Sequence, residues 1–108
     1  MTGQYKKWEI WLAKVKFEDC DTVVNRPVII TGIGEAAILA VKVTKHEPRR
    51  SYIGEYRITC WHEAGLRMPS TARLSKRLHL CESDMVHKIG RLHPSDILRI
   101  QQMIQNLI

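Results

Sequence analysis

The sequence lacks most of the features that mark a metal site, a disulfide framework or a membrane protein. Its three cysteines, Cys20, Cys60 and Cys81, include no CxxC pair and match no zinc-site spacing. No group of acidic residues has metal-site spacing, and no apolar run approaches the length of a membrane span. Residues 1–7 are not followed by the apolar stretch of a signal peptide. We therefore expect a cytoplasmic protein with reduced cysteines, no metal, no other cofactor and no membrane association.

Internal repeats and low-complexity segments are also missing from the 108 residues. Hydrophobic residues make up 44% of the chain and charged residues 26%, a balance typical of globular proteins. This length suits one ordinary domain and leaves no room for a second core. We therefore predict a single domain over residues 1–108.

Positive charge is in excess. Lysine and arginine number 17 against 11 aspartate and glutamate residues, which gives a net charge of +6 and an isoelectric point near 9.5. A small basic domain suits a polyanionic partner, and nucleic acid is the commonest one. A solvated basic surface without such a partner is the alternative that charge alone leaves open.

Apolar residues alternate with polar ones in several stretches, which predicts β-strands. In the first stretch, Trp11, Ala13 and Val15 fall on one face. In the second, Pro27 has no N–H for a ladder, so it belongs at the start of a strand or on an edge. A turn is expected at residues 32–35. The expected strands cover residues 8–17, 26–31, 36–43, 52–58, 70–80 as one or two strands, and 86–92.

The end of the chain has a different periodicity. Apolar residues recur there at helical spacing, at Ile97, Leu98, Ile100, Met103, Ile104 and Leu107. Pro94 suits the first helical position, and Asp96 lies in the first turn, where the helix dipole favours an acid. A single helical turn ended by Gly65 is also expected over residues 60–65. Together these patterns predict a mainly β (α+β) fold, a small curled sheet or barrel closed by an amphipathic helix.

Four segments together resemble the MazF/PemK family of toxins. Residues 11–17 (WLAKVKF) precede a short acidic loop and residues 25–30 (NRPVII), and residues 61–70 (WHEAGLRMPS) and 88–92 (KIGRL) follow in the same order as in that family. The resemblance covers almost the whole chain. It implies an SH3-like β-barrel of short antiparallel strands with a C-terminal helix, usually present as a homodimer. It also implies a type II toxin–antitoxin endoribonuclease, which cleaves single-stranded RNA and is silenced by a cognate antitoxin protein in the RNA groove.

The same resemblance points to candidate catalytic residues. Arg26 matches the family's arginine before proline, and its forked, permanently charged guanidinium suits the oxygens of a phosphate. Thr44 ends the third expected strand, where the family has threonine or serine. His46 shares a face with Thr44 if that strand continues, and it can exchange a proton near neutral pH. Asp21 replaces the family's loop glutamate in a loop without glycines. The alternatives are a surface arginine at a strand start, an ordinary strand threonine, a solvent-exposed histidine and a plain loop acid, respectively.

Basic and aromatic residues complete the expected RNA groove. Basic side chains can contact phosphates without reading the sequence, and the candidates are Lys45, Arg49, Arg50, Arg67, Arg73, Lys76 and Arg77. Tyr52, Tyr56 and Trp61 are candidates either for stacking on unpaired bases or for the core. Trp8 and Trp11 are expected in the core.

The resemblance implies a metal-independent endoribonuclease that uses the substrate's own 2′-hydroxyl and leaves a cyclic phosphate and a 5′-hydroxyl. Such an attack requires a proton acceptor, positive charge to stabilise the phosphorane and a donor that helps the 5′-oxygen to leave. The alternative is a non-catalytic SH3-like module that binds RNA or protein, because small barrels serve both purposes. A metal-dependent nuclease is disfavoured by the missing acidic cluster.

Overall fold

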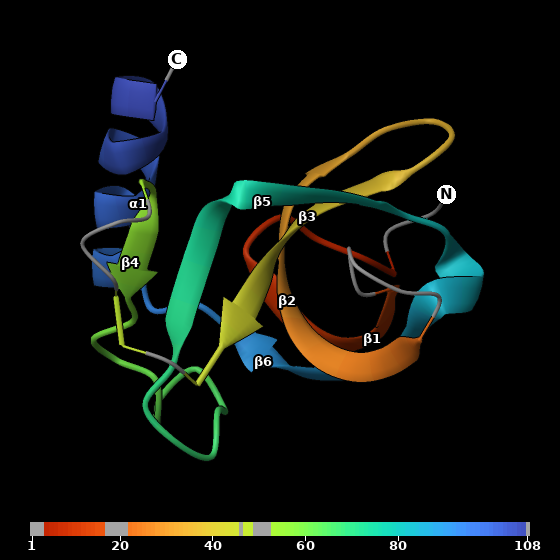
Figure 1. Ribbon diagram of the computed structural model, residues 1–108, viewed down its shortest axis with the longest axis horizontal. Coiled ribbons are helices and arrows are strands. Elements are labelled where there is room, and N and C mark those ends of the chain that lie inside the picture. The colour runs from red at the N-terminus through yellow and green to blue at the C-terminus, as the bar shows by residue number, and fades with distance from the viewer. Residues whose placement is uncertain (1–3, 17–21, 46, 49–52, 108) are drawn as a thin grey trace.

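Figure 1 shows the computed structural model of the chain, which describes residues 4–16, 22–45, 47–48 and 53–107. The described residues form one antiparallel sheet with the strand order β4-β5-β3-β2-β1-β6, followed by a C-terminal helix. The sheet curls into a barrel-like shape (Figure 1). The elements are β1 (Glu9–Lys16), β2 (Val23–Ile33), β3 (Ile38–Thr44), β4 (Glu55–Arg57), β5 (Thr71–Leu80), the short 3-10 helix η1 (Glu82–Asp84), β6 (Met85–Arg91) and α1 (Pro94–Leu107). The expected mainly β fold with a terminal helix is confirmed.

Both faces of the central strands are buried, and successive residues of one strand enter different apolar clusters. Val28 and Ile30 of β2 belong to a cluster with Trp11 and Ala13, whereas Ile29 between them belongs to a cluster that includes Ile100 of α1. Side chains of a strand point alternately to its two faces, so this division is the geometric result of the pleat. It also explains the near-continuous apolar runs of β2 and β3. Trp8 and Trp11 are buried, as expected.

Strand β2 is longer than the sequence indicates. It begins at Val23, so the expectation that Pro27 starts the strand is wrong. Pro27 pairs with Leu12 of β1, but the described pairs between β2 and β3 begin only at Val28. A residue without an N–H is tolerated here because β2 has a ladder on one side only. The edge interpretation of Pro27 therefore holds for this half of the strand.

The segment between β4 and β5 makes the single helical turn that was expected, but no regular helix. Strand β4 is shorter than the expected 52–58, and residues 59–65 form hydrogen-bonded turns. The Ala64 amide donates to the Cys60 carbonyl at 3.1 Å, and Gly65 then takes a φ of 93°. Glycine has no Cβ to oppose this left-handed conformation, which lets the chain reverse. From Ser70 the chain enters β5, which is one strand with an irregular register against β3 between Val41 and Lys42.

The C-terminal helix packs through part of the predicted apolar face. It begins at Pro94, as expected, and Ile100 is completely buried, while Ile97, Met103 and Ile104 are partly buried against the same cluster. Leu98 is 57% exposed, so the prediction that it belongs to the packed apolar face is wrong. The side chain of Leu107 lies outside the described residues. The Nδ1 of His93 accepts a hydrogen bond from the Ser95 amide at 3.2 Å and so caps the first turn.

Candidate functional site

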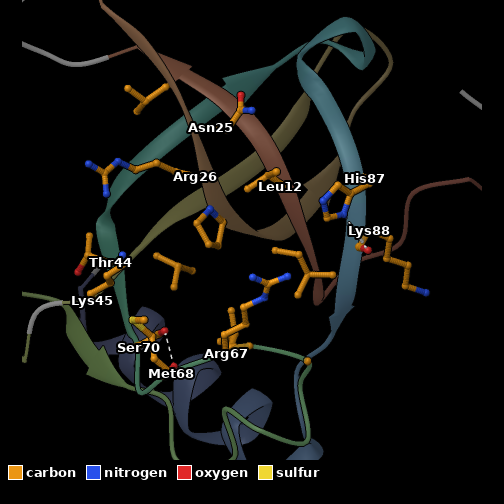
Figure 2. A pocket seen from close by; sticks show the side chains of 16 residues that line it. Leu12, Asn25, Arg26, Thr44, Lys45, Arg67, Met68, Ser70, His87 and Lys88 are labelled. Atoms are coloured by element: carbon orange, nitrogen blue, oxygen red, sulfur yellow. Dashed lines mark hydrogen bonds between the residues drawn. The ribbon is translucent and has the colours of Figure 1, made fainter.

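A pocket of about 820 Å³ lies where β1, β2, β3 and β6 meet the loop before β5 (Figure 2). Its volume is that of a site for a small ligand or for part of a polymer. The lining residues are Leu12, Val24, Asn25, Arg26, Pro27, Val43, Thr44, Lys45, Gly65, Leu66, Arg67, Met68, Ser70, His87, Lys88 and Ile89.

The pocket opens where β2 and β3 separate. Val28 and Lys42 form the last described pair of these strands on this side. From there Arg26 continues beside Ala13 of β1, and Thr44 continues beside Thr71 of β5. The two strands thus follow different neighbours, and the ends of both strands line the space between them. Figure 2 shows Arg26 and Thr44 on the same side of this space.

The floor of the pocket is apolar and is built from aligned strand positions. His87 of β6 pairs with Leu12 of β1, and Leu12 pairs with Pro27 of β2. Directly opposed residues of neighbouring strands point to the same face of a sheet. His87 therefore shares a face with Leu12 and Pro27, and all three line the pocket with Val43.

All formally charged side chains among the described lining residues are cations. They are Arg26, Lys45, Arg67 and Lys88, and His87 can become a fifth. A cleft lined by charges of one sign concentrates ligands of the opposite sign. The pocket is therefore suited to an anion, and its apolar floor is suited to a flat or aliphatic group beside that anion.

Lys88 is tied to a buried acid at the side of the pocket. Its Nζ lies 2.9 Å from Oε2 of Glu9, and the Trp11 indole donates to the other carboxylate oxygen at 3.0 Å. Burial raises the pKa of Glu9, but the hydrogen bonds from Trp11, Lys88 and the Lys6 amide outweigh this effect, so the pKa lies below its usual value. Figure 2 shows the Lys88 side chain directed away from the pocket. The ion pair of Lys88 with Glu9 therefore links β6 to β1.

Asp96 of α1 holds the start of the loop that forms one wall. This carboxylate is completely buried, and it accepts hydrogen bonds from the Tyr56 hydroxyl, the Thr59 amide at 3.0 Å and the Cys60 amide at 2.8 Å. Burial raises its pKa, but these donors outweigh burial and lower it overall. Burial, followed by the bond to Asp96, raises the pKa of Tyr56. The sequence placed Asp96 correctly in the first turn, but its partners come from the loop.

A second anchor of the same wall is a close approach of two backbones. A Cβ atom on Gly90 would lie 2.0 Å from the Ala64 carbonyl oxygen, and one on Gly65 would lie 2.6 Å from the Ile89 carbonyl oxygen. Only glycine at both positions permits this approach without displacement of the backbone. The loop is thus pressed against β6, which places Arg67 at the edge of the pocket.

The structure brings four of the predicted site residues together and separates others. Arg26, Thr44, Lys45 and Arg67 line one pocket. Three predicted RNA contacts on β5, Arg73, Lys76 and Arg77, are not among its lining residues. The Arg73 Nε instead lies 3.2 Å from Glu55, and Arg77 lines another hollow of about 600 Å³ beside α1. Asp21, His46, Arg49 and Arg50 lie outside the described residues, as does Tyr52.

The sequence did not single out several residues that line the pocket, namely Asn25, Met68, Ser70 and His87. Asn25 is next to Arg26 and could have been included on that ground. His87 lay in an expected strand, but only the pairing with Leu12 shows which space it faces. Of the aromatic candidates, Tyr56 donates to Asp96 and Trp61 packs against the core cluster that contains Ile100. Both contacts favour their structural interpretation.

Two absences can be stated for residues 4–16, 22–45, 47–48 and 53–107. Nowhere in these ranges do three or more histidine, cysteine, aspartate or glutamate side chains gather in a way that could hold a metal ion. None of the helices within them combines the length and apolar character that crossing a bilayer requires.

Comparisons with known proteins identify the fold. No protein-family model matches the sequence, and no curated protein matches it. Among solved structures, the Mycobacterium tuberculosis toxin MazF-mt6 superimposes with a TM-score of 0.71, covering 91% of this chain and 93% of that chain at 19% sequence identity. The chain therefore has a MazF-like toxin fold, as the sequence segments around Arg26 and the C-terminal helix predicted.

Proposed function

We propose that this protein is the toxin of a type II toxin–antitoxin system and a metal-independent endoribonuclease that cleaves single-stranded RNA. The observation that carries this proposal is the position of Arg26 beside Thr44 in a pocket whose described charged side chains are all cations. A phosphodiester is an anion, and a cationic pocket with an apolar floor suits a phosphate and the base or sugar attached to it. The MazF-like fold supports the same assignment.

Arg26 is assigned to the phosphorane formed during cleavage. Its guanidinium is a forked donor that remains charged at all working pH values, and it is a poor base for the same reason. We therefore propose that it stabilises the negative charge on the two non-bridging equatorial oxygens of the phosphorane. The Thr44 hydroxyl can donate to one of these oxygens or orient the 2′-hydroxyl, and Lys45 adds positive charge beside it.

The proposed reaction needs only the RNA and proton transfers. The 2′-oxygen attacks the adjacent phosphorus and loses its proton, the bond from phosphorus to the 5′-oxygen breaks, and that oxygen takes up a proton. The products are a 2′,3′-cyclic phosphate and a 5′-hydroxyl. Asp21 and His46 belong to the proposal as additional acid–base groups. We assign Arg49, Arg50, Arg73, Lys76 and Arg77 to RNA beyond the pocket.

The proposed partners follow from the charge of the pocket. An antitoxin that blocks it should present an acidic, disordered segment, because such a segment complements the cations and becomes ordered on binding. We further propose that the toxin forms a homodimer and acts in the cytoplasm. The alternative, a non-catalytic module, would use the same pocket to bind RNA without cutting it.

The test is cleavage of a long RNA by the purified protein in EDTA, with the ends of the products mapped. We expect cleavage in EDTA with cyclic phosphate and 5′-hydroxyl ends, and no cleavage by Arg26→Ala prepared in the same way. Products with 5′-phosphates, or a strict need for magnesium, would contradict the mechanism. RNA binding without any cleavage would favour the non-catalytic module.

A further inference from the structure

The pocket has a second polar end, away from Arg26 and Thr44. Figure 2 shows Arg26, Thr44 and Lys45 on one side, His87 on the opposite strand β6, and Arg67 between them, rising from the loop before β5. Arg67 and His87 thus enter the pocket from different walls. The mechanism proposed above uses neither residue.

Arg67 carries a charge that the described residues do not neutralise. Its side chain is exposed, and no described residue forms an ion pair with it. The loop that carries it passes close to β6, because a Cβ atom on Gly65 would lie 2.6 Å from the Ile89 carbonyl oxygen. A guanidinium at the edge of a pocket is well suited to the oxygens of a phosphate.

One ring nitrogen of His87 has a partner within the chain. Its Nδ1 lies 3.3 Å from the Lys88 carbonyl oxygen. The other ring nitrogen, Nε2, can donate a hydrogen bond to a phosphate oxygen whenever it carries a proton.

From these observations we propose that Arg67 and His87 form a second phosphate subsite, which holds the phosphate of a nucleotide next to the one that is cleaved. This inference rests on the proposed function, since it names how the same pocket holds a longer RNA. The phosphate oxygens accept hydrogen bonds from the Arg67 guanidinium and from the Nε2–H group of His87.

The described groups around His87 suit an anion. Leu12 faces it from β1 and is apolar, while Lys88 precedes Ile89 on the same strand and is paired with Glu9. The other described charged groups that line the pocket are Arg26 on β2, Lys45 after β3 and Arg67 in the loop. Among the described lining residues, a phosphate bound at His87 therefore meets only cationic, polar and apolar side chains.

The test measures the affinity for a non-cleavable RNA, a random-sequence oligonucleotide with 2′-O-methyl groups throughout, against salt concentration. Each phosphate contact of a single strand contributes about 0.7 to the slope of log affinity against log salt. Arg67→Ala should therefore lower that slope by about 0.7. His87→Ala removes one donor to the same phosphate and should weaken binding at a fixed salt concentration.

Matched controls are available outside the pocket. His79 is an exposed histidine on β5, and Arg99 is an exposed arginine on α1, and each lines a different hollow. His79→Ala and Arg99→Ala should keep the parent's slope and its affinity. In single-turnover cleavage, Arg67→Ala and His87→Ala should need a higher RNA concentration than the parent to reach half of the maximal rate.

The possible failures are distinguishable. If the parent binds and cleaves RNA but Arg67→Ala and His87→Ala keep its salt slope, the subsite is wrong and the proposed function stands. If the slope is unchanged while Arg67→Ala loses binding to poly-glutamate, the pair receives an acidic peptide and the RNA subsite is overturned. If the parent binds no RNA at all, the proposed function fails first.

Discussion

Arg26 and Thr44 occupy facing positions in the register of β2 and β3, two residues beyond their last described pair. That pair is Val28 with Lys42, and two steps along each strand lead to Arg26 and Thr44. Residues two apart on a strand point to the same face, so both side chains lie on the face of Val28 and Lys42. No pair of β2 and β3 is described beyond Val28 and Lys42 on this side, so no continuous ladder joins the two strands at Arg26 and Thr44, and both residues line the pocket.

Arg26→Ala should abolish cleavage without unfolding the protein. Its charge is proposed to act on oxygens that become more negative in the transition state, and loss of such a donor typically lowers the rate about 100- to 1,000-fold. Arg26→Lys should restore little, because an ammonium cannot reproduce the fork. The measurements are single-turnover cleavage, RNA affinity and thermal stability. Equal losses of rate and affinity would make Arg26 a binding residue only.

Thr44→Ala should lower the rate less than Arg26→Ala, and Thr44→Ser should nearly restore it. The hydroxyl is the group with a proposed role, and serine keeps it. Thr44→Val provides the matched control, because valine keeps the branched shape but removes the hydroxyl. If Thr44→Val cleaves at the rate of the parent, the hydroxyl has no part in the reaction.

The strands themselves could be predicted from the sequence because alternation is a local property. The burial of Trp11, Ala13 and Val15 on one face of β1 follows directly from their spacing. The pairing of strands is not local. It determines that Pro27 lies within a strand, and that Thr44 rather than Arg77 shares the pocket with Arg26.

The loop before β5 shows the same limit. Its composition suggested a helical turn ended by Gly65, and the glycine does take the left-handed conformation. What fixes the loop is its contacts with distant elements, namely the bonds of Asp96 to Thr59 and Cys60 and the approach of Gly90 to Ala64. No local pattern contains them, so the position of Arg67 could not be predicted.

Ile100→Ala should destabilise the fold strongly, and Leu98→Ala should not. Ile100 is completely buried, and shortening such a side chain to alanine costs about 2–5 kcal/mol. Leu98 is two residues away on the same helix but mostly exposed, where substitutions usually change stability by less than about 0.5 kcal/mol. Urea unfolding of the two variants is the comparison. Equal stability of both would mean that α1 does not pack as described.

Asp96→Asn should destabilise the protein at neutral pH, and its free energy of unfolding should depend less on pH in the acidic range than that of the parent. Asparagine has an NH2 group in place of one carboxylate oxygen, so at least one of the three groups that donate to Asp96 loses its acceptor. An unsatisfied buried group costs about 1–3 kcal/mol. The pKa of Asp96 is lowered in the folded state, so its contribution is present above the unfolded pKa of about 3.9 and is lost as the pH falls through the folded value.

The measurement is the free energy of unfolding of the parent and Asp96→Asn between neutral pH and about pH 2. The difference between them should shrink as the medium becomes acidic, because protonated Asp96 also loses its role as an acceptor. Glu35→Gln removes an exposed acid and serves as the control, with little change expected in either quantity. A difference that stays constant over this range would show that the charge of Asp96 does not stabilise the loop.

Gly90→Ala should destabilise the protein and also weaken RNA binding. The added Cβ would lie 2.0 Å from the Ala64 carbonyl oxygen, so the loop or β6 must move, and overpacking of this kind typically costs about 1–3 kcal/mol. The loop carries Arg67, so the movement displaces one cation of the proposed second subsite.

Gly34→Ala is the control, because its Cβ meets the Ala37 carbonyl oxygen only at 3.4 Å, an ordinary contact. Thermal unfolding and the salt dependence of RNA affinity should both change in Gly90→Ala. Neither should change in Gly34→Ala. A Gly90→Ala protein that melts with the parent would mean that the loop and β6 are not pressed together, and the wall of the pocket would then need another anchor.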